Sequence, residues 1–429
     1  MKKVIILSLF FFTACTSGDT TTTTVPDTTT TTVPDTTTTT VPDTTTTTVP
    51  DTTTTTVQEN STPNFGPINV ITANDFEFPK FFYTTEIKEC TALPPVSFDS
   101  DDSQNLVESV IGFDWHKYHM ETGTSLVVDH SVINLPMQTW MIATHNALIN
   151  GEDNNLAIAK DFAVQIAKVD TLHNSYGYEE LKDLGMCWEN NDPDAPCHYH
   201  EYEFAANWFG MYLINMHSLK DEFNQEELKE VNRYIEKMYE KFLQPRMFEE
   251  QDKGFYGMAN QGILALVYAS WTDDKELATE EFNFRFQEMN RLFLDDGYIY
   301  NNSFRGTRGQ WYHSYGVNIG LGYVHIAQAW NVPVPEQILY KLKKSAEIVN
   351  LAITDYDKFT SRELTEYVRN ATSEENARKF THQMAFGIDV LMKRIVDVDL
   401  VNDPTWMSKK QFHIKEGIDT NIGFNPLCI

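Results

Sequence analysis

Side chains able to hold a carboxylate and move a proton beside it gather in one stretch of the chain. An amide pair, Asn260-Gln261, is followed by a stretch of 43 residues that contains a helix-like spacer. The run that then follows holds two cations, two phenols and an imidazole: Arg305, Arg308, Tyr312, His313 and Tyr315. Guanidinium groups bind carboxylates through parallel hydrogen bonds, and a phenol beside a cation can act as base or acid. This set suits β-elimination on a uronic acid polymer.

The chemistry of β-elimination gives each of these residues a predicted role. The proton α to the carboxylate is weakly acidic, so fixed donors must stabilise the aci-carboxylate that forms. Asn260, Gln261 and Arg305 could supply these donors, and Tyr312 is the predicted base and acid. The scheme uses no metal or other cofactor. Three more residues are predicted to contact the substrate: Arg308, His313 and Tyr315.

Each assignment has a structural alternative. The two arginines could pair with Asp295 and Asp296, Asn260 could cap the helix that follows it, and His313 could be a hydrogen-bonded core histidine. The joint spacing of the set favours the functional interpretation, because independent structural roles would seldom reproduce it.

A second polar group precedes an apolar helical stretch at residues 198–208. His200 and Trp208 are predicted to line the same groove, and His200 is a candidate substitute base. The alternative is a set of ordinary polar groups at a helix start beside a disulfide. A zinc site made of Cys197, His198 and His200 is a further alternative, although the sequence offers no convincing fourth ligand.

Helical periodicity dominates the chain from about residue 106, and no long run alternates at period two. The expected helices are Leu106–Met120, Pro136–Asn150, Asn155–Leu172, Tyr199–Ser218, Glu226–Leu243, Gly257–Trp271, Glu276–Phe293, Tyr312–Trp330, Pro335–Asn350 and Ala377–Val396. Some are apolar on several faces, as an inner layer would be, whereas Glu226–Leu243 and Glu276–Phe293 are amphipathic, as an outer layer would be. This alternation predicts an all-α fold, either an (α/α) toroid or a helical solenoid.

The combined pattern resembles the alginate lyase family of polysaccharide lyases. That family places an Asn-His pair at the start of an inner helix and Arg-Gly-x-Arg-x-x-x-Tyr-His further on; Asn260, Arg305, Arg308, Tyr312 and His313 fill these positions. The resemblance implies an incomplete (α/α) toroid with its active site in a central groove.

One position departs from the family pattern: Gln261 stands where the family has a histidine that contacts the carboxylate and can act as base. Glutamine can donate a hydrogen bond but cannot hold a proton near neutral pH. Proton transfer would then fall to Tyr312, which can serve both steps when the proton and the leaving group lie on one face of the sugar.

The N-terminus predicts export. Residues 1–14 combine a basic start with an apolar stretch too short to span a membrane, and small residues precede Cys15. This is typical of a lipoprotein signal in which Cys15 is lipidated; the alternative is a plain secretory signal. Residues 15–57 repeat Asp, Thr, Val and Pro and are expected to form a disordered tether. The folded domain is predicted at 58–429, held at the cell surface or in the periplasm.

Charge and cysteines limit the partners and the redox state. The formal charge of −28 argues against nucleic acid as a partner. It also fits poorly with a polyanionic substrate unless a cleft gathers the arginines.

Four cysteines beyond Cys15 favour disulfides in an exported protein. A local pair of Cys187 with Cys197 is expected, and Cys90 and Cys428 could join the two ends of the domain.

Two other classes of function compete with the lyase. A surface glycan-binding lipoprotein would keep the groove without turnover, which the Gln261 substitution makes plausible. A glycoside hydrolase would need paired carboxylates, for which Glu201 with Glu203, or Asp295 with Asp296, are the candidates. Only a lyase would release an unsaturated uronate.

Overall fold

The computed structural model describes residues 63, 65–122, 131–180, 198–244, 254–255, 262–304, 309–362, 387–401, 417–419 and 421–429. All of them lie in one unit, Ser61–Ile429. Within these ranges the secondary structure is helical, and β-pairing is confined to isolated bridges. The all-α prediction is thus confirmed for the described part of the chain, while the predicted signal and tether lie outside it.

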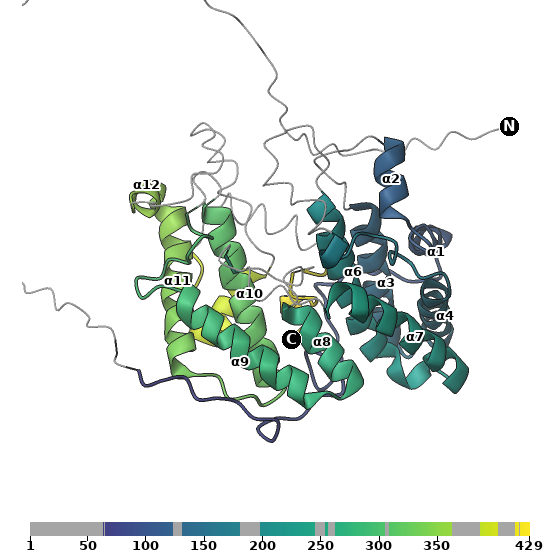
Figure 1. Cartoon of the computed structure of the whole chain (residues 1–429), viewed down its shortest axis with the longest axis horizontal. Helices are drawn as coiled ribbons and strands as arrows, with labels where there is room; N and C mark the ends of the chain where they lie inside the picture. The colour runs from purple at the N-terminus through teal and green to yellow at the C-terminus, as the bar shows by residue number, and fades with distance from the viewer. Residues whose placement is uncertain are drawn as a thin grey trace, which may run out of the picture. The chain divides into compact units, whose positions relative to one another are not determined.

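Figure 1 shows the described α-helices in chain order. They are α1 (Asp101–Glu108), α2 (Trp115–Thr122), α3 (Ser131–Asn150), α4 (Asp153–Lys168), α6 (His198–Leu219), α7 (Gln225–Phe242), α8 (Gly262–Thr272), α9 (Lys275–Leu292), α10 (Gly309–Ala329), α11 (Glu336–Thr354), α12 (Tyr356–Thr360) and α14 (Ile388–Val396). Two 3₁₀ turns, Lys220–Glu222 and Pro426–Cys428, complete the set.

The largest departure from the expected helices lies near the start. The stretch predicted as one helix, Leu106–Met120, is divided between α1 and α2. Gly112, between them, has a φ of 73°, a left-handed conformation that glycine adopts without steric cost and that a continuing helix excludes. The short helix α12 was not predicted at all.

Two kinds of helix account for the packing. In α8 only Tyr268 and Thr272 have appreciable exposure, and in α10 every residue from 316 to 327 is buried. In α7, by contrast, only one stripe is buried, made of Val231, Tyr234, Ile235, Met238 and Phe242. Helix α8 contacts both α6 and α9, and α10 contacts α11 and α14 (Figure 1). Fully enclosed helices therefore alternate along the chain with helices that present a polar face.

The start of α7 shows how local sequence fixes an element. Asn224 Oδ1 accepts hydrogen bonds from the N–H groups of Glu226 and Glu227, and the Glu227 side chain returns to the Asn224 N–H. This capping box satisfies donors that a helix start would otherwise leave open. The helix predicted at Glu226–Leu243 is confirmed, with each end one residue earlier, at Gln225 and Phe242.

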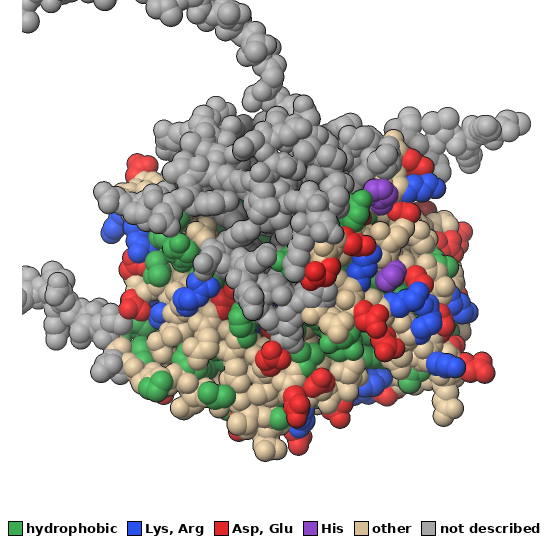
Figure 2. Space-filling view, in the orientation of Figure 1, with side chains coloured by type: hydrophobic (Ala, Val, Ile, Leu, Met, Phe, Trp, Pro, Cys, Tyr) green, Lys and Arg blue, Asp and Glu red, His purple; other side chains and the backbone are tan. Residues whose placement is uncertain are grey.

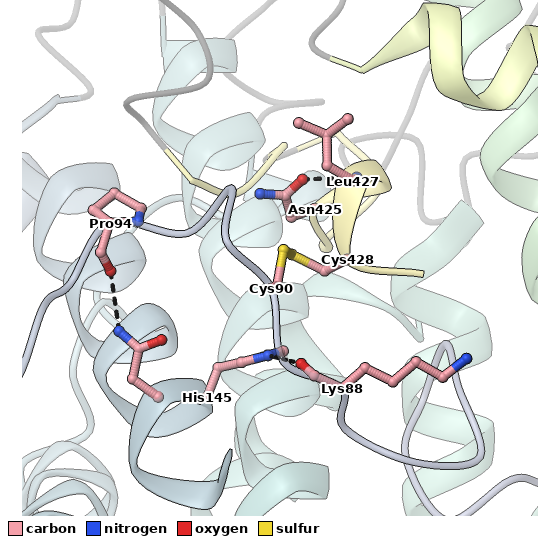
Figure 3. Close-up of a disulfide and its surroundings, with 8 residues drawn as sticks. Lys88, Cys90, Pro94, His145, Asn425, Leu427 and Cys428 are labelled. Atoms are coloured by element: carbon pink, nitrogen blue, oxygen red, sulfur yellow. Dashed lines mark hydrogen bonds between the residues drawn. A yellow bond between two sulfur atoms is a disulfide. The ribbon is translucent and has the colours of Figure 1, made fainter. Parts of the chain in front are cut away.

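A disulfide between Cys90 and Cys428 joins the lead-in before α1 to the C-terminal turn, with 5.0 Å between the two Cα atoms (Figure 3). Close by, His145 of α3 hydrogen-bonds the Lys88 carbonyl, and its burial lowers its pKa. The ring of Tyr83 stacks on Phe424 at 5.0 Å. The pairing suggested by the positions of these cysteines in the sequence is confirmed, whereas the pair predicted for Cys187 and Cys197 lies outside the described residues.

Replacing Cys90 and Cys428 together with serine is expected to lower the free energy of unfolding by about 2–4 kcal/mol, because the bond closes a very long loop in the unfolded chain. The two cysteines are 338 positions apart. Urea unfolding of the double variant and the parent would measure the loss. An unchanged urea midpoint would contradict a stabilising role for this bond.

The surface around α7 and α9 mixes both signs of charge. Figure 2 shows acidic side chains distributed over this face, with lysines and arginines among them. Arg233 of α7, for example, pairs with Asp170 and Glu230, each at 2.7 Å.

None of the described helices combines the length and apolar composition that crossing a bilayer requires.

Candidate functional site

Four of the predicted site residues lie outside the described part of the chain: Asn260, Gln261, Arg305 and Arg308. Cys15, the predicted lipidation site, lies outside it too. The segments that flank the four are described. Residues 254–255 come before the amide pair and Gly262 follows it directly, while residues 299–304 and Gly309 stand on either side of the two arginines.

Tyr312 and Tyr315 occupy the first two turns of α10 and are half-buried. Residues three apart in a helix share a face, so both phenols lie on one side of α10. The ring of Trp311 lies 4.7 Å from that of Tyr312. Because α10 is enclosed from residue 316 to 327, this N-terminal end is where its aromatic side chains reach the surface. That placement agrees with the predicted roles of Tyr312 and Tyr315 without testing them.

His313, predicted to contact substrate, is instead fully buried. Its Nε2 lies 2.9 Å from the Ser345 carbonyl oxygen and its Nδ1 lies 2.8 Å from Ser303 Oγ. A carbonyl only accepts, so Nε2 carries the hydrogen and Nδ1 accepts from the serine hydroxyl. Burial lowers the pKa of His313 to about 4. Full burial supports the structural alternative for His313, a neutral core histidine that ties α10 to α11, and its contact with substrate stays a prediction.

Trp208, also predicted to line a groove, is fully buried in α6. Its ring stacks on Tyr212 at 5.6 Å, within the core. The structure thus places this indole in the core, and its role in lining a groove stays a prediction. His200 lies in the first turn of α6, and its side chain is outside the described set.

The buried amide of Asn302 connects the two flanks of the candidate site. Its Oδ1 accepts from the Phe255 N–H at 2.7 Å, and its Nδ2 donates to the carbonyls of Phe255 at 3.0 Å and Tyr312 at 2.9 Å. The next residue, Ser303, bonds His313 as described above. Asn302 and Ser303, which precede the arginine pair, thus bind Tyr312 and His313 at the start of α10.

An ion cluster lies beneath the start of α8. Arg285 of α9 donates from Nε to Glu281 at 2.7 Å and from a terminal nitrogen to Glu288 at 2.6 Å, and all three side chains are buried. The fully buried Tyr323 of α10 lies beside the guanidinium, and burial raises its pKa, which keeps the phenol neutral. A Cβ on Gly262 would stand 1.6 Å from the Tyr323 hydroxyl and 3.0 Å from the guanidinium. Only glycine fits there, so the residue after Gln261 rests directly on this cluster.

Sequence reasoning missed Asn302 and Arg285. Asn302 sits in a turn, where asparagine usually serves its own backbone. The Glu281, Arg285 and Glu288 spacing puts three charges on one side of a helix, which ordinarily indicates a solvated face. The one available signal was Gly262, a glycine opening an otherwise apolar helix, which indicates a close approach by another element.

Three of the four carboxylates considered for a hydrolase have partners in the structure: Glu201, Asp295 and Asp296. Glu201 is fully buried and accepts from the Tyr176 N–H at 2.8 Å. Asp295 lies 3.4 Å from Lys341, and Asp296 lies 2.9 Å from Arg362. Glu201 thus binds the backbone at Tyr176, whereas Asp295 and Asp296 form ion pairs at the surface.

Comparison with known proteins adds no assignment, since no family model and no curated protein matches this chain. Among the described residues, no group of His, Cys, Asp and Glu side chains could together hold a metal ion.

Proposed function

We propose that this chain is a polysaccharide lyase that cleaves a uronic acid polymer, such as alginate, by β-elimination. The observation that carries the proposal is the Asn302 amide, which ties the segment leading into Asn260-Gln261 to the α10 turn that bears Tyr312. Phe255, which lies five residues before Asn260, and Tyr312 are thereby joined through a single side chain. The N-terminal end of α10, with its half-buried phenols, is where a polymer would meet Tyr312.

In this proposal the helices form an incomplete (α/α) toroid. The support is the alternation of enclosed helices (α6, α8 and α10) with helices that present a polar face, such as α7. The enclosed helices α6 and α8 contact each other. Helices that present a polar face also contact each other, α4 with α7 and α9 with α11. A helical solenoid would share these contacts, so the toroid remains part of the proposal.

The proposed reaction assigns the proton to Tyr312 and the carboxylate to Asn260, Gln261 and Arg305. The phenolate of Tyr312 takes the α-proton, and the electron pair moves into the aci-carboxylate held by the amides and the guanidinium. The pair then returns to form the carbon–carbon double bond as the bond to the glycosidic oxygen breaks. The Tyr312 phenol returns its proton to that oxygen. Arg308 and Tyr315 bind the neighbouring sugar.

The cellular setting is proposed from the N-terminal sequence. Lipidation of Cys15 would anchor the exported chain, and the threonine-rich stretch 15–57 would hold the domain away from the membrane. In this arrangement the enzyme would act on polymer at the cell surface or in the periplasm.

One specific observation supports a second function. Gln261 replaces the histidine of the lyase pattern, and an amide in that position retains carboxylate binding while removing one possible base. A glycan-binding lipoprotein with an inactive lyase site is therefore the alternative.

The first experiment is an ultraviolet scan of the purified chain with mannuronate-rich alginate, guluronate-rich alginate, polyglucuronate and glycosaminoglycans. We expect absorbance from an unsaturated uronate to rise with one of these polymers, because only elimination makes that chromophore. Reducing ends without the chromophore would indicate a hydrolase. Binding without either product would support the glycan-binding alternative and overturn the lyase proposal.

A further inference from the structure

We infer that Asn302 is a positioning residue, one that sets the geometry of the candidate site without touching substrate. This inference rests on the proposed function, because Tyr312, whose backbone Asn302 holds, is assigned the proton transfer in elimination. Asn302 is fully buried, and its three hydrogen bonds go to the backbone of Phe255 and Tyr312. It holds the Tyr312 carbonyl, so it fixes the backbone from which the phenol projects.

The chemistry of the site calls for an amide. Phe255 presents one donor and one acceptor, and Tyr312 presents a second acceptor, so the joining side chain must accept once and donate twice. Asparagine does both from a single planar group. A carboxylate at position 302 could accept from the Phe255 N–H but could donate to neither carbonyl, and an alanine would leave three buried backbone groups without this partner.

The turn that carries Asn302 is itself fixed on both sides. The Ser303 hydroxyl accepts from the Ile299 N–H at 2.7 Å and bonds His313, and the Ser303 N–H returns to the Ile299 carbonyl at 2.9 Å. His313 continues the connection to Ser345 on α11. Through these bonds the first turn of α10 is held in a fixed position relative to α11 and to residues 254–255.

Gly316 provides the space for this amide. A Cβ built on Gly316 would lie 2.7 Å from Asn302 Nδ2 and 3.0 Å from the Ile299 side chain. Glycine normally destabilises a helix interior relative to alanine by about 1 kcal/mol. Its presence in α10 is explained by the close approach of Asn302.

The test compares Asn302→Ala and Gly316→Ala with Asn318→Ala. Asn318 is a matched control because it is another fully buried amide, on α10, that donates to Asp419 at 2.8 Å on a different face of the helix. For each folded variant, kcat and KM on the polymer cleaved by the parent would be measured, together with hydrogen exchange of the peptides covering 254–262 and 309–316.

We expect Asn302→Ala to reduce kcat by about 10–100-fold, with a smaller change in KM, because misplacement by about 1 Å can cost that much in rate. Gly316→Ala should act in the same direction, and both should speed exchange in the two peptides. Asn318→Ala should alter neither kcat nor exchange there. Unchanged exchange in Asn302→Ala, or faster exchange with an unchanged kcat, would overturn the inference.

A failure of the lyase proposal gives a different result. If the parent shows no elimination with any polymer, the proposed reaction fails, while the exchange data still decide whether Asn302 joins the two segments. Affinity for the bound polymer then replaces kcat as the readout. Equal affinity of Asn302→Ala and Asn318→Ala would overturn the positioning role in that case.

Discussion

Replacing Arg285 with leucine is expected to destabilise the folded domain by about 3–5 kcal/mol, which is typical when one partner of a buried ion pair is removed. The guanidinium binds Glu281 and Glu288 where all three side chains are shielded from water. Without it, two buried carboxylates would face one another with no cation between them. The free energy of unfolding from urea titration would measure the loss.

Arg233 provides a matched control for this prediction. It also binds two carboxylates, those of Asp170 and Glu230, each at 2.7 Å, but its side chain is 36% exposed. Water and salt screen such a pair, so Arg233→Leu should cost no more than about 1 kcal/mol. Similar losses for Arg233→Leu and Arg285→Leu would contradict the importance of burial at Arg285.

A compensated variant separates charge from packing. Replacing Glu281 and Glu288 with glutamine in the Arg285→Leu background removes the isolated negative charges, so we expect part of the lost stability to return. The start of α8 rests on this cluster through Gly262. Loss of stability without this recovery would indicate that Arg285 acts by filling space rather than by pairing charge.

The helices could be predicted from the sequence because their periodicity is a local property. The start of α7 follows from Asn224 and Glu227 alone, and its single buried stripe matches the expected amphipathic pattern. The break between α1 and α2 was missed because one glycine in the left-handed conformation carries little weight in a window of apolar residues.

The site was predicted less well because burial depends on tertiary contacts. His313 and Trp208 have side-chain types that suit substrate binding, yet both lie in the core. Arg285 on α9 shows the opposite case. It is a charged residue on a helix expected to lie in the outer layer, yet it is buried against Tyr323 of α10. Neither outcome can be derived from spacing within one helix, since each depends on a neighbouring helix distant in sequence.

Tyr312→Phe is expected to reduce elimination by about 10²–10⁴-fold, the usual contribution of a general acid or base, while polymer affinity changes little. Phenylalanine retains the ring that packs beside Trp311 and removes only the hydroxyl. The backbone bond from Asn302 to the Tyr312 carbonyl is also retained, so the turn should keep its position. Initial rates of chromophore formation and equilibrium binding would be measured on the same polymer.

Tyr340→Phe is the control, because Tyr340 is a half-buried tyrosine on α11 whose ring lies 5.4 Å from Phe65 and whose hydroxyl has no assigned role. It should retain the activity of the parent. Full activity in Tyr312→Phe would remove Tyr312 from the mechanism and leave His200 as the sequence-derived candidate base. Loss of both activity and affinity would instead make the hydroxyl a binding group. Only loss of rate with affinity retained assigns proton transfer to this phenol, and that result would also show that Gln261 is compatible with catalysis.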